Sequence, residues 1–218
     1  MKKTVAVIPV KLNNERCPGK NIKCFDNGRP LISYILDTIK KVEGIEEIYV
    51  YCSNPEIKGY LPEGVQYLKR KEYLDLSTTS ILAVLQEFAK DVPAENYVLV
   101  HATAPFIKAS SIQKGVEAVV SGEYDSALTV TKMQEFLWRD GKPWNYDVTI
   151  IPRTQDLEPL YTETTGMYIY KRELVLEKNR RVGDNPYLVE VSKIEAIDIN
   201  DPIDFVIANA CRDAAEEE

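Results

Sequence analysis

The sequence contains a single histidine and four cysteines, and this scarcity excludes several kinds of site. The cysteines, at positions 17, 24, 52 and 211, form no CxxC pair, so neither a disulfide framework nor a zinc site is expected. A serine hydrolase would have to use His101, and no GxSxG motif accompanies it. We therefore expect reduced thiols and a cytoplasmic protein.

Long hydrophobic runs and an excess of positive charge are also missing. The apolar run from Thr4 to Val10 is too short to span a membrane, contains Pro9 and leads into a polar loop, which argues against a signal peptide. The net charge of -7 argues against nucleic-acid binding, although a local basic cluster can still bind an anionic substrate. With 44% hydrophobic and 28% charged residues, we expect one globular domain over residues 1–218, with no membrane partner.

Strand-like and helix-like segments alternate along the chain. Strands are expected at residues 4–10, 45–52, 65–68, 97–100, 126–131, 166–170 and 194–199. Helices are expected to begin at Pro30, after a Ser77 cap, after a cap at Ser110 or Ser111, and at Pro202. This order predicts an α/β fold with a mostly parallel sheet between two helical layers, which binds ligands at the carboxyl ends of its strands.

Residues 133–160 interrupt this pattern. Trp138, Asp140-Gly141, Pro143 and Trp144 indicate a hairpin or an extended excursion from the domain.

The loop after the first strand carries a concentration of basic and amide side chains. Lys11, Arg16 and Lys20 lie in one loop with Asn13 and Asn21, and a triphosphate needs such cations and donors around its oxygens. A solvated basic loop would have the same composition, so residue chemistry alone leaves both interpretations open.

The same loop resembles the N-terminal signature of the cytidylyltransferases that make CMP-sialic acid and CMP-Kdo. The residues that match the sialic-acid form at the same spacing are Ile8, Pro9, Pro18, Lys20 and Asn21. The run Arg16, Pro18, Gly19 and Lys20 is similar to the Kdo form, and residues 28–32 are similar to the family's G-K-P-L-I. The resemblance implies a Rossmann-like fold in which Lys11 and Lys20 stabilise charge on CTP while Asn13, Arg16 and Asn21 bind the nucleotide. Lys11 replaces the usual arginine, and Glu15 replaces a common lysine.

A second resemblance concerns residues 70–80, which are similar to the family's R-P-E-x-L segment and the hydroxyl cluster after it. It implies that Arg70 and Ser80 contact the nucleotide. Helix capping alone would explain one of the hydroxyls between Ser77 and Ser80.

Two further segments resemble the family's sugar-binding residues. Residues 98–105 are similar to an L-Q-P-T-S-P strand end, and residues 162–170 to a segment that ends in G-x-Y. The resemblance implies that His101, Thr103, Thr165 and Tyr168 contact the sugar, although His101 also fits a satisfied histidine at the rim of the sheet. Glu163 stands where sialic-acid enzymes carry an arginine. The Arg180-Arg181 pair fits either a contact with the sugar carboxylate or an exposed helix end.

Residues 195–204 resemble the family's I-D-I-D-x-P-x-D motif, in which two aspartates hold Mg²⁺. The resemblance implies that Asp198 binds Mg²⁺ and that Asn200 lies on the same face and completes the shell with an amide oxygen.

Together these resemblances predict transfer of CMP from CTP to a 2-keto sugar acid, with release of pyrophosphate, for surface polysaccharide biosynthesis. They also imply a homodimer whose subunits meet through residues 133–160; a hairpin that packs on its own subunit is the alternative. Two other functions remain open: a nucleotidyltransferase for a sugar phosphate or phosphorylated alcohol, and a non-catalytic nucleotide-binding homologue.

Overall fold

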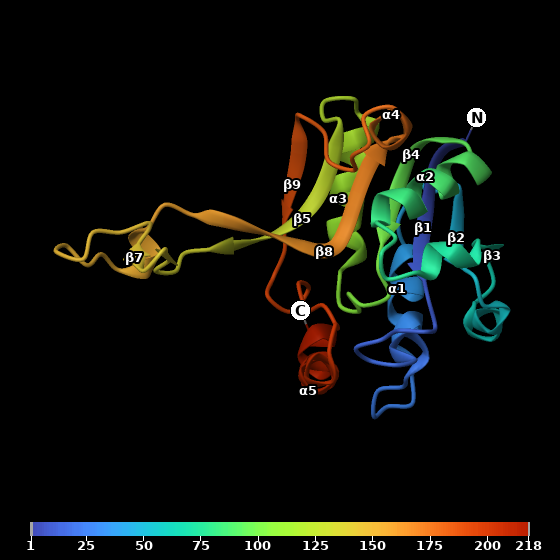
Figure 1. Cartoon of the computed structure of the whole chain (residues 1–218), viewed down its shortest axis with the longest axis horizontal. Helices are drawn as coiled ribbons and strands as arrows, with labels where there is room; N and C mark the ends of the chain where they lie inside the picture. The colour runs from blue at the N-terminus through green and yellow to red at the C-terminus, as the bar shows by residue number, and fades with distance from the viewer. Residues whose placement is uncertain (1, 218) are drawn as a thin grey trace.

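The computed structural model describes residues 2–217 and is built around a seven-stranded sheet (Figure 1). Its strand order is β3-β2-β1-β4-β8-β5-β9, and all neighbours pair in parallel except β8, which is antiparallel to β4 and β5. The sheet strands are β1 Lys2–Val10, β2 Glu47–Cys52, β3 Val65–Lys69, β4 Ala94–Val100, β5 Ser126–Met133, β8 Leu160–Lys171 and β9 Pro186–Glu190. The mostly parallel α/β sheet predicted from the sequence is confirmed.

Helices cover both faces of the sheet. They are α1 Leu31–Ile39, α2 Ile81–Asp91, α3 Ala109–Val120, α4 Arg172–Leu176 and α5 Pro202–Glu217, and the short 3-10 turns are η1 Lys20–Ile22, η2 Pro55–Tyr60, η3 Glu72–Asp75 and η4 Thr154–Asp156. Strand β1 is buried on both sides: Ala6, Ile8 and Val10 belong to the core under α1 and α3, whereas Val5 and Val7 belong to the core under α2 and α4. A strand buried on both faces needs an unbroken apolar run, which the sequence supplies. Among the described residues, no helix has the length and apolar character needed to cross a membrane.

A third, smaller core lies beneath α5. Phe25, Tyr34 and Phe106 pack there with Ile199 and Phe205, so the core joins the loop after β1 to α1, the loop after β4 and the C-terminal helix. In Figure 1 the loop after β1 and α5 both lie below the sheet, at the end opposite to the N-terminus. This core therefore fixes the segments that surround the carboxyl ends of β1 and β4.

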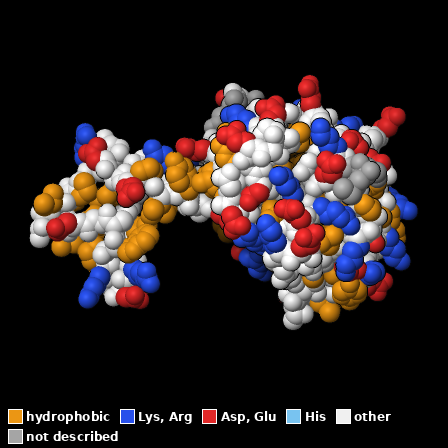
Figure 2. Space-filling view, turned by 90° about the horizontal axis from the view of Figure 1, so that it is seen from above, with side chains coloured by type: hydrophobic (Ala, Val, Ile, Leu, Met, Phe, Trp, Pro, Cys, Tyr) orange, Lys and Arg blue, Asp and Glu red, His pale blue; other side chains and the backbone are white. Residues whose placement is uncertain are grey.

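Residues 133–160 form an arm that projects away from the sheet, as Figure 1 shows. Its small sheet consists of β6 Trp138–Arg139 and β7 Lys142–Pro143. Figure 2 shows hydrophobic side chains gathered along the arm, and Trp138, Ile150 and Ile151 are 61%, 73% and 71% exposed. The excursion predicted here is thus an extended arm that carries a short two-stranded sheet.

Three predicted helix starts are displaced in the structure. Helix α2 is capped by the Ser80 hydroxyl, which accepts a hydrogen bond from the Ala83 amide, and not by Ser77. Helix α3 begins at Ala109 with Lys108 in the cap position, and the Ser111 hydroxyl instead donates to Glu195. Pro30 occupies the cap position of α1 and is not its first residue.

The predicted strand at residues 194–199 is wrong. The segment is irregular: the buried Glu195 carboxylate accepts from the Lys108 amide and the Ser111 hydroxyl, and the Ile199 amide donates to the Thr103 carbonyl. The last strand of the sheet is β9, which begins at Pro186, a residue tolerated at the start of a strand because it donates no ladder bond there.

Candidate active site

The loop that leaves β1 turns sharply at Gly19, which has a left-handed φ of 66° that glycine adopts without strain. The turn starts η1 and directs Lys20 inward, where its ammonium donates to the Ile199 carbonyl over 2.5 Å. Burial lowers the pKa of Lys20, while the nearby Asp198 carboxylate acts in the opposite direction. Asn21 is buried, and its side-chain amide donates to the Lys11 carbonyl at 2.9 Å, so it holds the start of the loop.

A cavity of about 290 Å³ brings three basic residues of this loop together. We call it the cation cavity; it is lined by Lys11, Asn14, Glu15, Arg16, Cys17, Lys20 and Asn200. Arg16 donates to the Asn200 side-chain oxygen at 2.7 Å and lies 3.6 Å from the Asp201 carboxylate. Arg16 and Asn200, 184 positions apart, therefore lie at one wall. With three basic side chains in its lining, the cavity suits an anion with several charged oxygens.

Asp198 and Asn200 lie side by side at this wall, although their segment is not a strand. The Asn200 amide nitrogen donates to one Asp198 oxygen at 2.5 Å. The other Asp198 oxygen, Oδ1, is buried and has no hydrogen-bond partner among the described residues. Asp204, in the first turn of α5, accepts from the backbone amides of Asn200 and Asp201, and these bonds lower its pKa. Asp204 thus fixes the turn that presents Asp198.

A neighbouring cavity of about 450 Å³ lies beyond the carboxyl ends of β1, β2 and β3. We call it the Asp75 cavity; it is lined by Leu12, Asn13, Ser53, Asn54, Pro55, Glu72, Asp75 and Leu76. The Asp75 carboxylate accepts from the Ser53 hydroxyl and from the buried Arg70 guanidinium, and its backbone carbonyl lies 3.4 Å from the Lys11 ammonium. Asp75 therefore connects Arg70 with Lys11, a link that no motif in the sequence indicated.

A third group of side chains lies where β8 runs beside β4. His101 Nδ1 bonds the Thr165 carbonyl at 2.8 Å, and the His101 ring meets the Tyr168 ring edge-on at 6.4 Å. Burial lowers the pKa of His101. Because a carbonyl can only accept, Nδ1 carries the proton and Nε2 of the neutral ring is an acceptor.

Arg181 covers this group from the loop after α4. Its guanidinium lies 3.5 Å from the centre of the Tyr168 ring and 3.3 Å from a Glu163 carboxylate oxygen, which also accepts from the Tyr168 hydroxyl. We call His101, Glu163, Tyr168 and Arg181 the Tyr168 cluster. Arg181 is only 23% exposed, so the helix-end interpretation does not describe it; Arg180 instead pairs with Asp184.

The other sequence candidates lie around these groups. Thr165 has a buried hydroxyl without a hydrogen-bond partner among the described residues, and the carbonyl of Thr103 holds the Ile199 amide. Ser80 is exposed and caps α2. Gly166 is needed for close packing, because a Cβ there would lie 3.0 Å from Ile107 and from Thr129 side-chain atoms.

The profile of a family described as Cytidylyltransferase matches residues 5–208. The chain belongs to this cytidylyltransferase family. The match includes β1, the loop with Lys11 and Lys20, and the Asp198 turn, and it ends within α5.

The individual relatives of this chain are distant in sequence. It is 25% identical to N-acylneuraminate cytidylyltransferase A of Danio rerio over 93% of this chain and 49% of that protein. It is 26% identical to CMP-N,N'-diacetyllegionaminic acid synthase of Legionella pneumophila over 98% of this chain and 97% of that one. The chain spans about half the length of the first curated relatives that it matches.

Among solved structures, the fold is similar to that of a CMP:2-keto-3-deoxy-manno-octonic acid synthetase complexed with CTP. The TM-score is 0.72 with 16% identity, and the alignment covers 100% of both chains. At this identity the likeness concerns the fold alone.

The donor set at the Asp198 turn fits Mg²⁺ through one carboxylate. The buried, unpartnered Oδ1 of Asp198 is the free hard ligand, and Mg²⁺ commonly binds through one or two carboxylates and keeps several waters. The Asn200 oxygen already accepts from Arg16, so one of its two lone pairs is left for a metal. Within residues 2–217 no group of three His, Cys, Asp or Glu side chains forms a denser metal site.

Proposed function

We propose that this protein transfers CMP from CTP to a 2-keto sugar acid and releases pyrophosphate. The observation that carries the proposal is the cation cavity itself, which Lys11, Arg16 and Lys20 line together with Asn200, the partner of Asp198, in a chain of the cytidylyltransferase family. In the reaction the anomeric hydroxyl oxygen of the sugar forms a bond to the α-phosphorus of CTP. The bond from that phosphorus to the β-phosphate bridge breaks, and pyrophosphate and a proton leave.

The triphosphate fits the cation cavity and the nucleoside fits the Asp75 cavity. Lys11 lines the first and contacts Asp75 in the second, so the two cavities adjoin at this residue. Lysine and arginine side chains placed around the phosphates stabilise the charge that develops as pyrophosphate leaves. Held at Asp198, Mg²⁺ would neutralise charge on the phosphate oxygens and orient the leaving group.

The Tyr168 cluster is the proposed sugar site. His101 Nε2 is an acceptor for a sugar hydroxyl, Thr165 has an unused hydroxyl, and Arg181 offers a guanidinium to the carboxylate of an acidic sugar. In the structure Glu163 pairs with that guanidinium at 3.3 Å. An arginine at position 181 thus supports an acidic sugar despite the glutamate at position 163.

We also propose a homodimer formed through the arm. Tryptophan and isoleucine side chains exposed on a projecting hairpin are a typical interface surface, and a second copy of the chain is the partner that the resemblance implies. Sedimentation of the intact protein should give twice the monomer mass, and paired Trp138→Ser and Ile150→Ser changes should give the monomer. The free cysteines fit a cytoplasmic protein.

The test of function is an acceptor panel. The full chain, CTP and Mg²⁺ are incubated with sialic, legionaminic, pseudaminic and Kdo-type acids, and with sugar phosphates and phosphorylated alcohols. We expect pyrophosphate release and a CMP-sugar by mass spectrometry with at least one keto acid. Turnover only with a phosphorylated acceptor would support the alternative transferase, and no turnover with any acceptor would support the non-catalytic homologue.

A further inference from the structure

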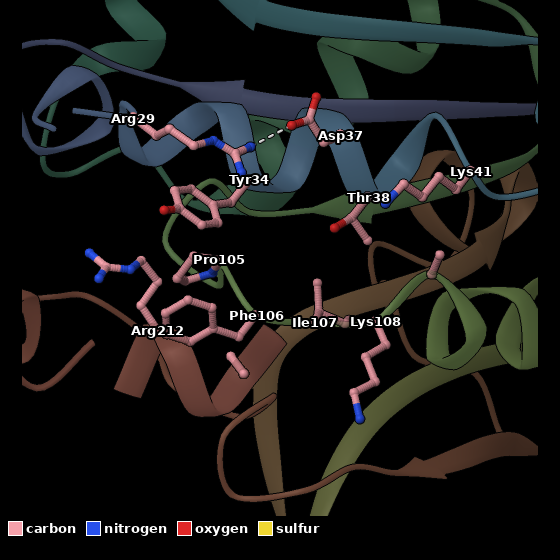
Figure 3. A pocket seen from close by; sticks show the side chains of 12 residues that line it. Arg29, Tyr34, Asp37, Thr38, Lys41, Pro105, Phe106, Ile107, Lys108 and Arg212 are labelled. Atoms are coloured by element: carbon pink, nitrogen blue, oxygen red, sulfur yellow. Dashed lines mark hydrogen bonds and ion pairs between the residues drawn. The ribbon is translucent and has the colours of Figure 1, made fainter. Parts of the chain in front are cut away.

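A further cavity, of about 300 Å³, lies between α1, the loop from β4 to α3, and α5 (Figure 3). We call it the α1–α5 cavity. It shares no lining residue with the cation cavity or the Asp75 cavity. The function proposed above makes no use of it.

The charge around this cavity is opposite to that of the chain. Four of its lining residues are basic, Arg29, Lys41, Lys108 and Arg212, and only Asp37 is acidic, whereas the whole chain has 27 basic and 34 acidic residues. In Figure 3 the Lys108 side chain extends away from the cavity, so the positive charge at the cavity comes mainly from the other three cations. Two of these are in ion pairs, Arg29 with Asp37 and Arg212 with Asp213, and Lys41 is in no ion pair with another described residue. The four residues come from three separate segments, which indicates a site formed by the fold and not by one basic stretch.

The one carboxylate in the lining, that of Asp37, is held among the described residues only by an exposed ion pair. Asp37 pairs with Arg29 at 2.5 Å, but the two side chains are 54% and 42% exposed. An exposed ion pair contributes about 0–1 kcal/mol, so a doubly charged anion can compete for Arg29.

Aromatic side chains form the wall of the cavity. Tyr34 and Phe106 meet edge-to-face with ring centres 6.1 Å apart, and the Arg29 guanidinium lies 4.4 Å from the centre of the Tyr34 ring. Apolar walls with a few convergent charges are typical of small-molecule sites. The pattern suits a ligand with a flat ring for the wall and an anionic group for the cations.

The other side of this wall supports the Asp198 turn. Tyr34 and Phe106 pack in one core with Ile199, whose neighbours in sequence are Asp198 and Asn200. The Ile199 carbonyl accepts from Lys20. The two rings therefore share a core with Ile199, which contacts Lys20 in the cation cavity.

We propose that the α1–α5 cavity is an effector site for a small organic anion, a phosphate or carboxylate carried on a flat ring. Its occupant sets the packing of Tyr34 and Phe106 and thereby changes the affinity of the cation cavity for CTP. Such coupling is reciprocal, so CTP changes the affinity for the anion by the same factor.

The binding test uses phenyl phosphate as the probe and titration calorimetry of the full chain without CTP. We expect one equivalent to bind, more tightly than inorganic phosphate, and Lys41→Glu to weaken binding about tenfold, the effect of losing a charge contact of about 1.4 kcal/mol. Lys40→Glu is the matched control, because Lys40 is exposed and does not line the cavity, and it should leave the dissociation constant within about twofold. Lack of binding, or binding that Lys20→Gln abolishes and Lys41→Glu leaves intact, would show that the site is wrong.

The coupling test measures the dissociation constant of CTP with and without saturating phenyl phosphate. We expect a change of about fivefold in the wild type and in Lys40→Glu, and a change of less than twofold in Lys41→Glu at the same probe concentration. An unchanged CTP affinity in the wild type with the probe bound would overturn the effector role. Because both tests use binding alone, they can succeed or fail independently of the sugar-acid transfer.

Discussion

The cation cavity and the Tyr168 cluster differ in how many of their contacts use the backbone, although Arg16–Asn200 in the first is a side-chain pair and His101 in the second bonds a carbonyl. In the cation cavity, Lys20 donates to the Ile199 carbonyl, Asn21 to the Lys11 carbonyl, and the Asp198 turn is fixed by backbone amides bound to Asp204. In the Tyr168 cluster, Arg181, Glu163 and the Tyr168 hydroxyl contact one another through side chains.

This difference in contacts determines how the geometry of each site responds to amino-acid substitution. A contact between a side chain and the backbone depends on the identity of one residue only, so it survives substitution of the residue that supplies the backbone group. Side-chain contacts change with each substitution, so the sugar side can be altered one residue at a time. We therefore expect changes in the cation cavity to affect the rate and changes in the Tyr168 cluster to affect the choice of sugar.

The largest effect is expected at Asp198. Asp198→Asn keeps the size of the side chain but removes the charge available to Mg²⁺, and should lower kcat about 10³-fold, close to 4 kcal/mol of transition-state stabilisation. Asp201→Asn is the control, since Asp201 pairs with Arg16 over 3.6 Å and is not a predicted ligand. If pyrophosphate release fell equally in the two variants, the proposal that Asp198 is the Mg²⁺ ligand would be contradicted.

The second-largest loss of activity is expected for a substitution of Lys20. Lys20→Gln removes a buried ammonium from the phosphates and should lower kcat/KM about 10²-fold, the usual loss for one electrostatic contact in a transition state. Lys23→Gln, at an exposed lysine over the Phe205 ring, should change it less than threefold. The midpoint of thermal unfolding, measured for both variants, shows whether a loss of kcat/KM comes from a loss of stability.

Much of this fold follows from the sequence because the parallel strands are buried on both faces. The runs at residues 4–10 and 97–100 are almost wholly apolar, and β1 and β4 contain them. For residues 194–199 the sequence pattern predicts the wrong structure. Their alternation of isoleucine with acidic residues is typical of a half-buried strand, but Glu195 caps α3 and the Ile199 amide bonds a loop.

Site residues could be predicted from the sequence where several of them lie close together in one segment. Lys11, Arg16 and Lys20 share one loop, and their convergence on a cavity follows from the short turn at Gly19. Asp75, at the end of η3, belongs to no such pattern, and a tertiary contact alone brings it to Arg70. For the Arg180-Arg181 pair the sequence leaves two interpretations open, and the contact with Tyr168 distinguishes Arg181 from Arg180.

A smaller effect, on substrate preference, is expected at Arg181. Arg181→Gln should raise the KM for the sugar acid about 10- to 30-fold while the KM for CTP stays within about twofold, since a hydrogen bond to a charged group contributes about 1.5–3 kcal/mol. The neighbouring Arg180→Gln, which loses its pair with Asp184, is the control. If both variants raise the KM equally, or if the methyl ester of the sugar acid is used as well as the acid by the wild type, Arg181 does not hold the carboxylate.

The smallest effect concerns stability at acid pH. Burial lowers the pKa of His101, so below its ordinary value of about 6.5 the unfolded chain binds a proton that the folded chain does not, and this stability is lost as the pH falls. His101→Gln should therefore lose less free energy of unfolding than the wild type between pH 7.5 and pH 5.5 in urea titrations. Parallel losses would show that His101 titrates alike in both states.

The most direct measurement is a crystal structure of the full chain with CTP and Mg²⁺ in the absence of a sugar. We predict the triphosphate in the cation cavity, in contact with Lys11 and Lys20, and a metal ion about 2.0–2.1 Å from Asp198 Oδ1, the usual Mg²⁺–oxygen distance. A triphosphate bound elsewhere, or an ion that shares no ligand with Asp198, would contradict the account.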